Sequence, residues 1–284
     1  MRSLSPADAA SPWWEVIELA ATFGAAALNA TYDANGTAGA RAGLSESMLV
    51  QCDISENTAF DPNGCAQAKD LRNHGCGGGS FVKAFDWVGC SGGLCAEADY
   101  PYVPHTDHGN CSAARCEVAC GTQVARSVEV APRSDVALRS ALAIGPVAVG
   151  VQANKNAFYY YKDGVLDDAA CFGGDLDHAI TAVGYGALDD ATAEYFIVKN
   201  SWGTSWGMGG FAYLARGANA SANASAGGTC GILVAPAYPV LNENISCPWR
   251  GAPTPAPSVS LAPSVSLDPT PAPTASSYSY AFVA

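Results

Sequence analysis

The sequence predicts an α+β fold in which a helical half is followed by a strand-rich half. Residues 15–28 are apolar nearly all round, which is typical of a buried helix. Residues 179–185 and 195–198 are apolar runs on either side of an acidic turn, a pattern that favours a β-hairpin. About 230 residues of such sequence are enough for two packed halves with a cleft between them, where ligand sites tend to form.

Composition divides the chain into three segments. We expect residues 1–12 to be unrelated to the domain that residues 13–249 form. Its helical half is predicted at about 13–123 and its strand-rich half at about 124–249. Residues 250–284 are rich in Pro, Ser, Ala and Thr, a composition that cannot bury a core, so we predict a disordered tail.

Charge and cysteine content narrow the classes of partner. The net charge is −12 with only 14 Lys and Arg among 284 residues, which disfavours nucleic acid or an anionic membrane as a partner. No apolar stretch is long enough to span a bilayer. Eleven cysteines without zinc-type spacing indicate disulfide bonds in an oxidising compartment, and we expect neither a metal nor another cofactor.

Acceptor triplets for N-glycosylation also favour the secretory pathway, among them Asn29-Ala30-Thr31 and Asn244-Ile245-Ser246. We therefore expect a glycoprotein of the lysosome or vacuole, or one that is extracellular. Residues 1–6 hold no apolar run of the kind that a signal peptide needs, so we expect the natural chain to begin at a different residue.

The strand-rich half carries the residue types of a general base and its orienting amide. His178 follows Asp177 at the start of the first apolar run, and Asn200 follows the second, with Trp202 two residues beyond. A histidine beside a thiol deprotonates it, while an amide oxygen that accepts from the other ring nitrogen holds the ring in place. A buried histidine in an ordinary hairpin is the alternative, which the joint occurrence of these residues disfavours.

These two segments resemble the histidine and asparagine strands of papain-family, cathepsin L-like cysteine peptidases. Other landmarks of the family follow in the same order: residues 44–53, Gly75-Cys76-Gly77-Gly78-Gly79, Tyr100-Pro101-Tyr102, Gly145-Pro146-Val147, Gly164-Val165-Leu166 and residues 230–239. The resemblance covers residues 13–241. It implies a papain-like fold of two halves, a helical left half and an antiparallel, β-barrel-like right half.

The resemblance also implies roles for individual residues. His178 and Asn200 would be catalytic, with Asp177 and Trp202 supporting them, and Trp202 would cover the His178–Asn200 hydrogen bond against water. Substrate backbone would pair along Gly78 and Gly79, where the missing side chains allow close approach. The pocket for the second residue upstream of the scissile bond would be lined by Phe81, Leu176, Ala179 and Ala235. None of these side chains is charged, which favours apolar substrate side chains there.

Two disulfide bonds are implied in the same way. Cys52 would pair with Cys111, and Cys171 would pair with Cys230. The second bond would join the loop before His178 to the last strand of the domain.

The nucleophile of the family is missing. In the family it is a cysteine at the start of the long central helix, where the helix dipole and the histidine lower its pKa, yet no cysteine precedes Cys52. Depending on the alignment, Pro12 or Trp14 stands at the nucleophile position, and neither side chain can attack a carbonyl. No glutamine precedes Gln51, so the side-chain donor of the oxyanion hole is missing as well.

Two functions are compatible with this sequence. The first is a papain-like cysteine endopeptidase that hydrolyses peptide bonds through a thiolate–imidazolium pair, with an incomplete N-terminus in this chain. The alternative is a catalytically dead papain-like module that binds peptides or regulates a partner. We expect a monomer whose partners are peptide or protein substrates and protein inhibitors.

Overall fold

The computed structural model describes residues 44–53, 73, 75, 78–96, 99–101, 111, 118, 122–188, 193–217, 220–221 and 227–242. The predicted helix at residues 15–28, the nucleophile position at Pro12 or Trp14, and the predicted disordered tail at residues 250–284 lie outside the described residues.

Two helices build the described part of the helical half. Helix α2 (Glu46–Cys52) begins where the Oγ of Ser45 accepts a hydrogen bond from the Met48 amide at 3.0 Å. Helix α3 (Phe81–Ser91) ends at Gly92, whose φ of 90° lies in the left-handed region that favours glycine. Their apolar faces share a core that includes Met48, Leu49, Phe85, Trp87, Val88 and Leu94.

The strand-rich half is organised around one sheet of seven strands, in the order β1-β7-β2-β4-β5-β6-β3. The strands are β1 (Val124–Glu129), β2 (Val147–Val151), β3 (Val165–Leu166), β4 (His178–Ala187), β5 (Glu194–Lys199), β6 (Phe211–Arg216) and β7 (Ala237–Leu241). Every pairing is antiparallel except the short one between β3 and β6. The predicted hairpin is therefore confirmed, as β4 and β5.

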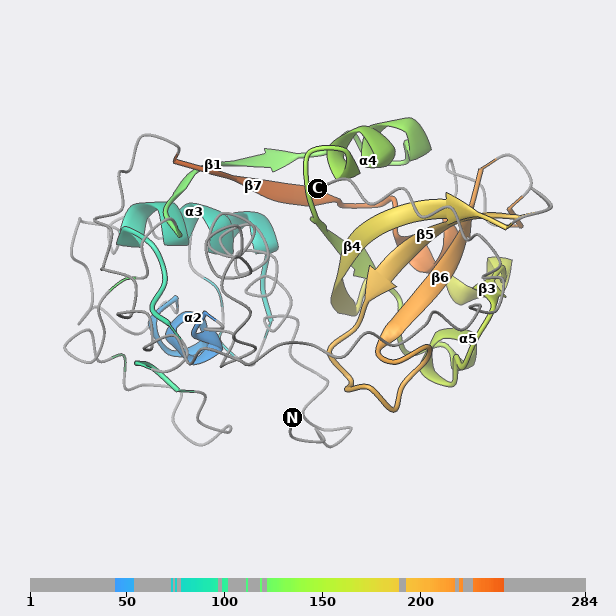
Figure 1. The fold of residues 1–284 in the computed structure, drawn as a ribbon, viewed down its shortest axis with the longest axis horizontal. Coiled ribbons are helices and arrows are strands. Elements are labelled where there is room, and N and C mark those ends of the chain that lie inside the picture. The colour runs from blue at the N-terminus through green and yellow to red at the C-terminus, as the bar shows by residue number, and fades with distance from the viewer. Residues whose placement is uncertain are drawn as a thin grey trace, which may run out of the picture.

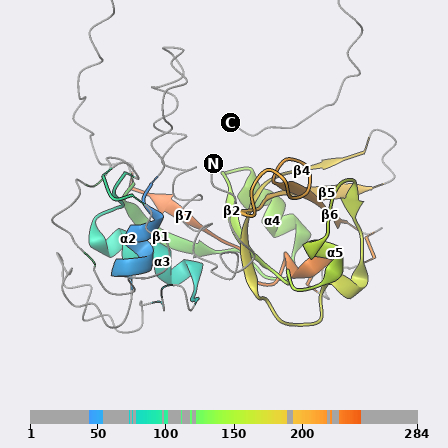
Figure 2. The same cartoon turned by 90° about the horizontal axis from the view of Figure 1, so that it is seen from below.

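The α+β fold with a helical half and an antiparallel half is confirmed, but the sheet is not closed. No ladder joins β1 to β3 among the described strands, so the sheet is open where the resemblance implied a barrel-like closure. In both views α2 and α3 lie on one side, and β4, β5 and β6 lie on the other (Figures 1 and 2). Strands β1 and β7 pack against α3, so they connect the two halves.

Short helices complete the strand-rich half. They are α4 (Asp135–Leu142), α5 (Asn156–Tyr159) and the 3-10 turns η7 (Ala169–Cys171) and η9 (Thr229–Gly231). None of the described helices has the length and apolar composition that crossing a bilayer requires.

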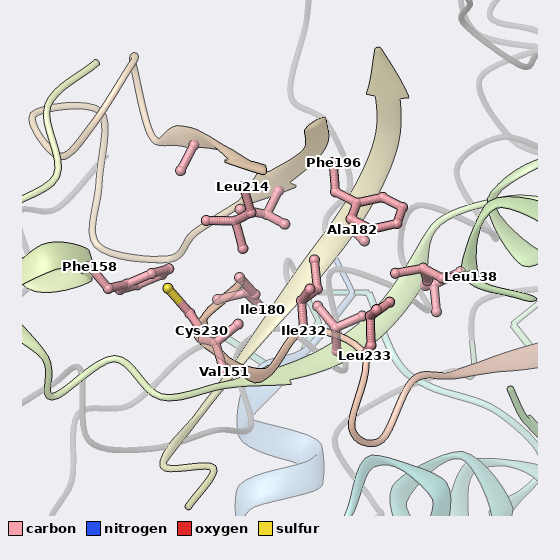
Figure 3. Packing of buried hydrophobic residues seen from close by; sticks show 14 of the residues in the cluster. Leu138, Val151, Phe158, Ile180, Ala182, Phe196, Leu214, Cys230, Ile232 and Leu233 are labelled. Atoms are coloured by element: carbon pink, nitrogen blue, oxygen red, sulfur yellow. The ribbon is translucent and has the colours of Figure 1, made fainter. Parts of the chain in front are cut away.

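The core of this half forms between the sheet and these short helices. Inward-facing residues of β2, β4, β5 and β6 are fully buried, among them Val151, Ile180, Phe196 and Leu214. Figure 3 shows how these side chains gather with Phe158 of α5 and with Ile232 and Leu233 beyond η9. Because His178 is the first residue of β4, this core supports the strand from which the histidine projects.

Candidate active site

His178 lies at the junction of β4 and β2. Its backbone is opposite Val151, the last residue of β2, and the amide of the preceding Asp177 donates to the Val151 carbonyl at 3.1 Å. The Asp177 carboxylate accepts hydrogen bonds from the backbone amides of Ala153 at 2.6 Å and Asn154 at 3.3 Å. These contacts tie the chain before His178 to the chain that leaves β2, so the imidazole starts from a fixed backbone position.

The side chains of His178 and Asn200 are joined by a hydrogen bond of 3.0 Å between Nε2 and Oδ1, as the sequence predicts. Since an amide oxygen can only accept, the Nε2 atom of His178 carries the proton. Asn200 lies just after β5, where its backbone amide donates to the Gly210 carbonyl, and its Oδ1 also accepts from the Ser201 amide at 2.8 Å. Both side chains are buried, so water has little access to the bond.

Aromatic rings cover this pair. The Trp202 ring lies 5.1 Å from the His178 ring, centroid to centroid, at an interplanar angle of 33°, which confirms the predicted packing of Trp202. Phe158 makes edge contacts with Trp202 at 5.8 Å and with His178 at 6.4 Å, and Trp206 meets Trp202 at 5.6 Å. Phe158 and Trp206 are not among the site residues that the sequence predicts, although the run of aromatic residues at 158–161 is a visible signal for the first of them.

Burial dominates the acid–base behaviour of His178. Loss of hydration lowers its pKa below the ordinary value of 6.5, while the hydrogen bond to Asn200 and the negative charge of Asp177 oppose the change. With its pKa lowered, the His178 imidazole is neutral at neutral pH, which is the protonation state that a general base requires.

The lowered pKa predicts a pH dependence of stability. As the pH falls below about 6.5, His178 takes up a proton in the unfolded chain but not in the folded one, so the free energy of unfolding decreases. This decrease continues down to the folded-state pKa, with a slope of at most about 1.4 kcal/mol per pH unit. Urea unfolding between pH 5 and pH 7.5 should show a steeper loss for the parent chain than for His178→Gln. Parallel pH profiles of the two chains would contradict this assignment.

A cleft of about 540 Å³ opens beside His178. One wall comes from the start of α3 and the residues before it, and the other from the segment at 176–179 and the start of β7. The predicted site residues that line it are Gly79, Phe81, Leu176, Asp177, His178, Ala179 and Ala235. Gly78 was predicted to contact substrate, but it is not among the lining residues; its φ of 99° instead turns the chain that leads into α3.

Three further residues, which are not among those predicted from the sequence, shape the cleft. Asn73 holds the segment before α3, since its Oδ1 accepts from the Ser80 amide at 2.9 Å. Gly150 of β2 lines the cleft beneath Leu176, and a Cβ there would lie 2.7 Å from the Leu176 Cδ1. Glu129, at the end of β1, adds a carboxylate to a lining that we had expected to be uncharged.

Both predicted disulfide bonds are confirmed. Cys52 and Cys111 are bonded with their Cα atoms 4.9 Å apart, and Cys171 and Cys230 with theirs 4.6 Å apart. The second bond connects η7, which leads into the loop before His178, to η9, which precedes β7. Cys90 and Cys95 each take part in a disulfide bond as well.

Comparison with known proteins identifies the relatives of this chain. It is 38% identical over 197 residues to the cysteine endopeptidase Rep1 of Oryza sativa subsp. japonica, an alignment that covers 69% of this chain and 46% of the rice protein. It is 36% identical over 216 residues to the cysteine proteinase EP-B 1 of Hordeum vulgare, covering 75% of this chain and 51% of the barley protein. The chain thus spans about half the length of the curated relatives it matches.

Solved structures agree with this relationship. The ragweed pollen allergen Amb a 11, a cysteine protease crystallised in its proform, aligns with a TM-score of 0.60 and 28% identity, over 80% of this chain and 57% of the allergen chain. A Carica candamarcensis cysteine protease in complex with E-64 aligns with a TM-score of 0.58 and 26% identity, over 84% and 93% of the two chains. The family model described as papain family cysteine protease matches residues 20–240. The chain therefore belongs to the papain family of cysteine proteases.

Proposed function

We propose that this chain is the peptidase domain of a papain-like cysteine endopeptidase, in which His178 is the general base and Asn200 orients its imidazole. The observation that carries the proposal is the 3.0 Å hydrogen bond between His178 and Asn200, covered by Trp202, at the edge of a 540 Å³ cleft. A base held in this way beside a cleft is suited to activating a nucleophile against a bound peptide.

In the proposed reaction His178 takes the proton of a cysteine thiol, and the thiolate attacks the carbonyl carbon of the scissile peptide bond. The imidazolium then returns the proton to the leaving amine as the C–N bond breaks, which leaves a thioester. Water, deprotonated by the now neutral His178, adds to the thioester and releases the carboxylic acid and the thiol. Asn200 keeps the ring in one orientation through these transfers, and Asp177 favours the charged imidazolium.

The thiol has to be supplied by the nucleophile segment of the family, because this sequence has no cysteine before Cys52. The same absence favours a second candidate function, a catalytically dead module that still binds peptides in the cleft. Hydrolysis by a chain with a restored thiol separates the two, since the second candidate remains inert when the thiol is present.

The surroundings of the site suggest partners and location. Phe81, Leu176, Ala179 and Ala235 supply apolar surface for the second residue upstream of the scissile bond, and an extended peptide or a protein inhibitor would occupy the same cleft. The disulfide bonds fit an oxidising compartment, so we place the protein in the secretory pathway, the lysosome or vacuole, or outside the cell.

The 284-residue chain itself is expected to show no thiol-dependent peptide hydrolysis, because neither Pro12 nor Trp14 can act as a nucleophile. The measurement is release of a fluorescent amine from a small peptide amide, with and without a thiol alkylating reagent. Hydrolysis that the alkylating reagent abolishes would contradict this expectation and would show that one of the later cysteines is the nucleophile.

A further inference from the structure

The cleft contains a carboxylate that the proposed reaction does not use. Two acidic side chains line it, Asp177 and Glu129. The Asp177 carboxylate already accepts the backbone amides of Ala153 and Asn154. The Glu129 side chain is exposed, and within the described part of the chain no ion pair or side-chain hydrogen bond engages it.

The order of strands places Glu129 at the far end of the cleft from His178. Glu129 of β1 is opposite Ala237 of β7, Ala237 is opposite Ala148 of β2, and β2 pairs with β4, whose first residue is His178. Three strand spacings separate β1 from β4, or roughly 14 Å at about 4.8 Å for each spacing. Glu129 and His178 therefore belong to separate parts of the cleft lining, three strands apart in the sheet.

The surface between these two ends is mostly apolar. Phe81 and Val82 border it from α3, Leu176 borders it from the loop before β4, and Ala235 and Pro236 border it from the chain that leads into β7. On the β2 side, Leu176 packs directly over Gly150, where any side chain would meet it. The cleft thus offers a length of apolar wall that ends at a solvated carboxylate.

We propose that this cleft selects a peptide side chain with a long apolar stem and a cationic end, that of lysine or arginine, whose charge pairs with Glu129. Lysine and arginine bury their methylene groups along apolar surface while the charged end stays in contact with water, and the cleft has both features in that order. An apolar side chain gains the same wall contacts but not the ion pair, so the preference is moderate. An acidic side chain is repelled by Glu129. The inference rests on the proposed function, since it takes the ligand of the cleft to be a peptide.

The test compares two labelled peptides that differ at one position, lysine or norleucine, so that the stems match and only the ammonium group is lost. Binding to the full chain is measured by fluorescence anisotropy. The parent chain should bind the lysine peptide about threefold to fivefold more tightly, a size typical of an exposed ion pair. The difference should shrink as the salt concentration rises from about 0.05 M to about 0.5 M.

Three variants identify the carboxylate responsible. Glu129→Gln should bind the two peptides equally, and Glu129→Lys should reverse the preference. Asp163→Asn is the matched control, because Asp163 is exposed, carries the same charge and does not line the cleft, so this variant should keep the preference. Thermal unfolding of each variant confirms that it is folded.

Equal binding of both peptides by the parent chain, or a lysine preference that survives in Glu129→Gln, would overturn the inference. Neither outcome touches the proposed function, because both peptides still bind in the cleft. A chain with a restored thiol that cleaves both peptides with equal kcat/KM would likewise remove the selectivity and keep the peptidase. If neither peptide is bound or cleaved, both the selectivity and the proposed function are contradicted.

Discussion

Restoring a thiol at the nucleophile position is expected to convert the chain from inert to active. Two repaired chains cover the two alignments, one with Pro12→Cys and one with Trp14→Cys, each with Gly-Ser before the cysteine, Trp-Ala-Phe after it and a glutamine upstream. At least one of them should hydrolyse a peptide amide on the order of 10³-fold or more above the parent chain, because loss of a nucleophile removes at least that much rate. The gain should disappear after treatment with a thiol alkylating reagent.

The same repaired chain provides the control for the base. Adding His178→Gln should remove about 10²-fold to 10⁴-fold of the restored rate, since the substituted amide cannot transfer the proton. Adding Asn200→Ala should cost less, because the imidazole remains but loses the bond that holds its orientation. A repaired chain that folds and binds peptides yet hydrolyses none would contradict the peptidase proposal and leave the peptide-binding module.

Removing the disulfide between Cys171 and Cys230 is expected to cause a large loss of stability. The double variant Cys171→Ser/Cys230→Ser opens a loop whose ends are 59 residues apart, which corresponds to about 4 kcal/mol of the free energy of unfolding in the chain-entropy account. For a domain of this size the melting temperature should fall by roughly 10 °C. Thermal unfolding followed by circular dichroism measures this change.

The bond between Cys52 and Cys111 offers a matched control, because its sequence separation is also 59 residues. Cys52→Ser/Cys111→Ser should therefore lose similar stability. Of the two bonds, the one between Cys171 and Cys230 lies beside the site. The Gln152 amide donates to the Cys230 carbonyl, and Leu176 packs close to Gly231, where a side chain would meet it. Peptide binding below both melting temperatures should weaken for the Cys171/Cys230 variant alone, and equal weakening in both would contradict this placement.

Much of the site could be predicted from the sequence because its central pair is local. His178 and Asn200 stand at the open end of a hairpin, and pairing of β4 with β5 brings them together whatever the rest of the fold does. Trp202 follows Asn200 closely enough to be carried to the same place. The resemblance supplied the disulfide partners and the pocket residues, which no local pattern contains.

The parts that were missed come from segments far apart in the sequence. Phe158 of α5 meets His178 at the start of β4 and Trp202 beyond β5, and Glu129 lines the cleft because β7 lies between β1 and β2. The openness of the sheet follows from the same strand order. Periodicity says which face of a strand is apolar, but it does not say which strand will be its neighbour.

The sequence by itself determined the α+β class, the β4–β5 hairpin and the base with its orienting amide, because each depends on residue type and short spacing. Only the tertiary structure decided the charge of the cleft and the lowered pKa of His178. Both are properties of an environment: the first depends on which strands become neighbours, and the second on how completely packing excludes water from the imidazole.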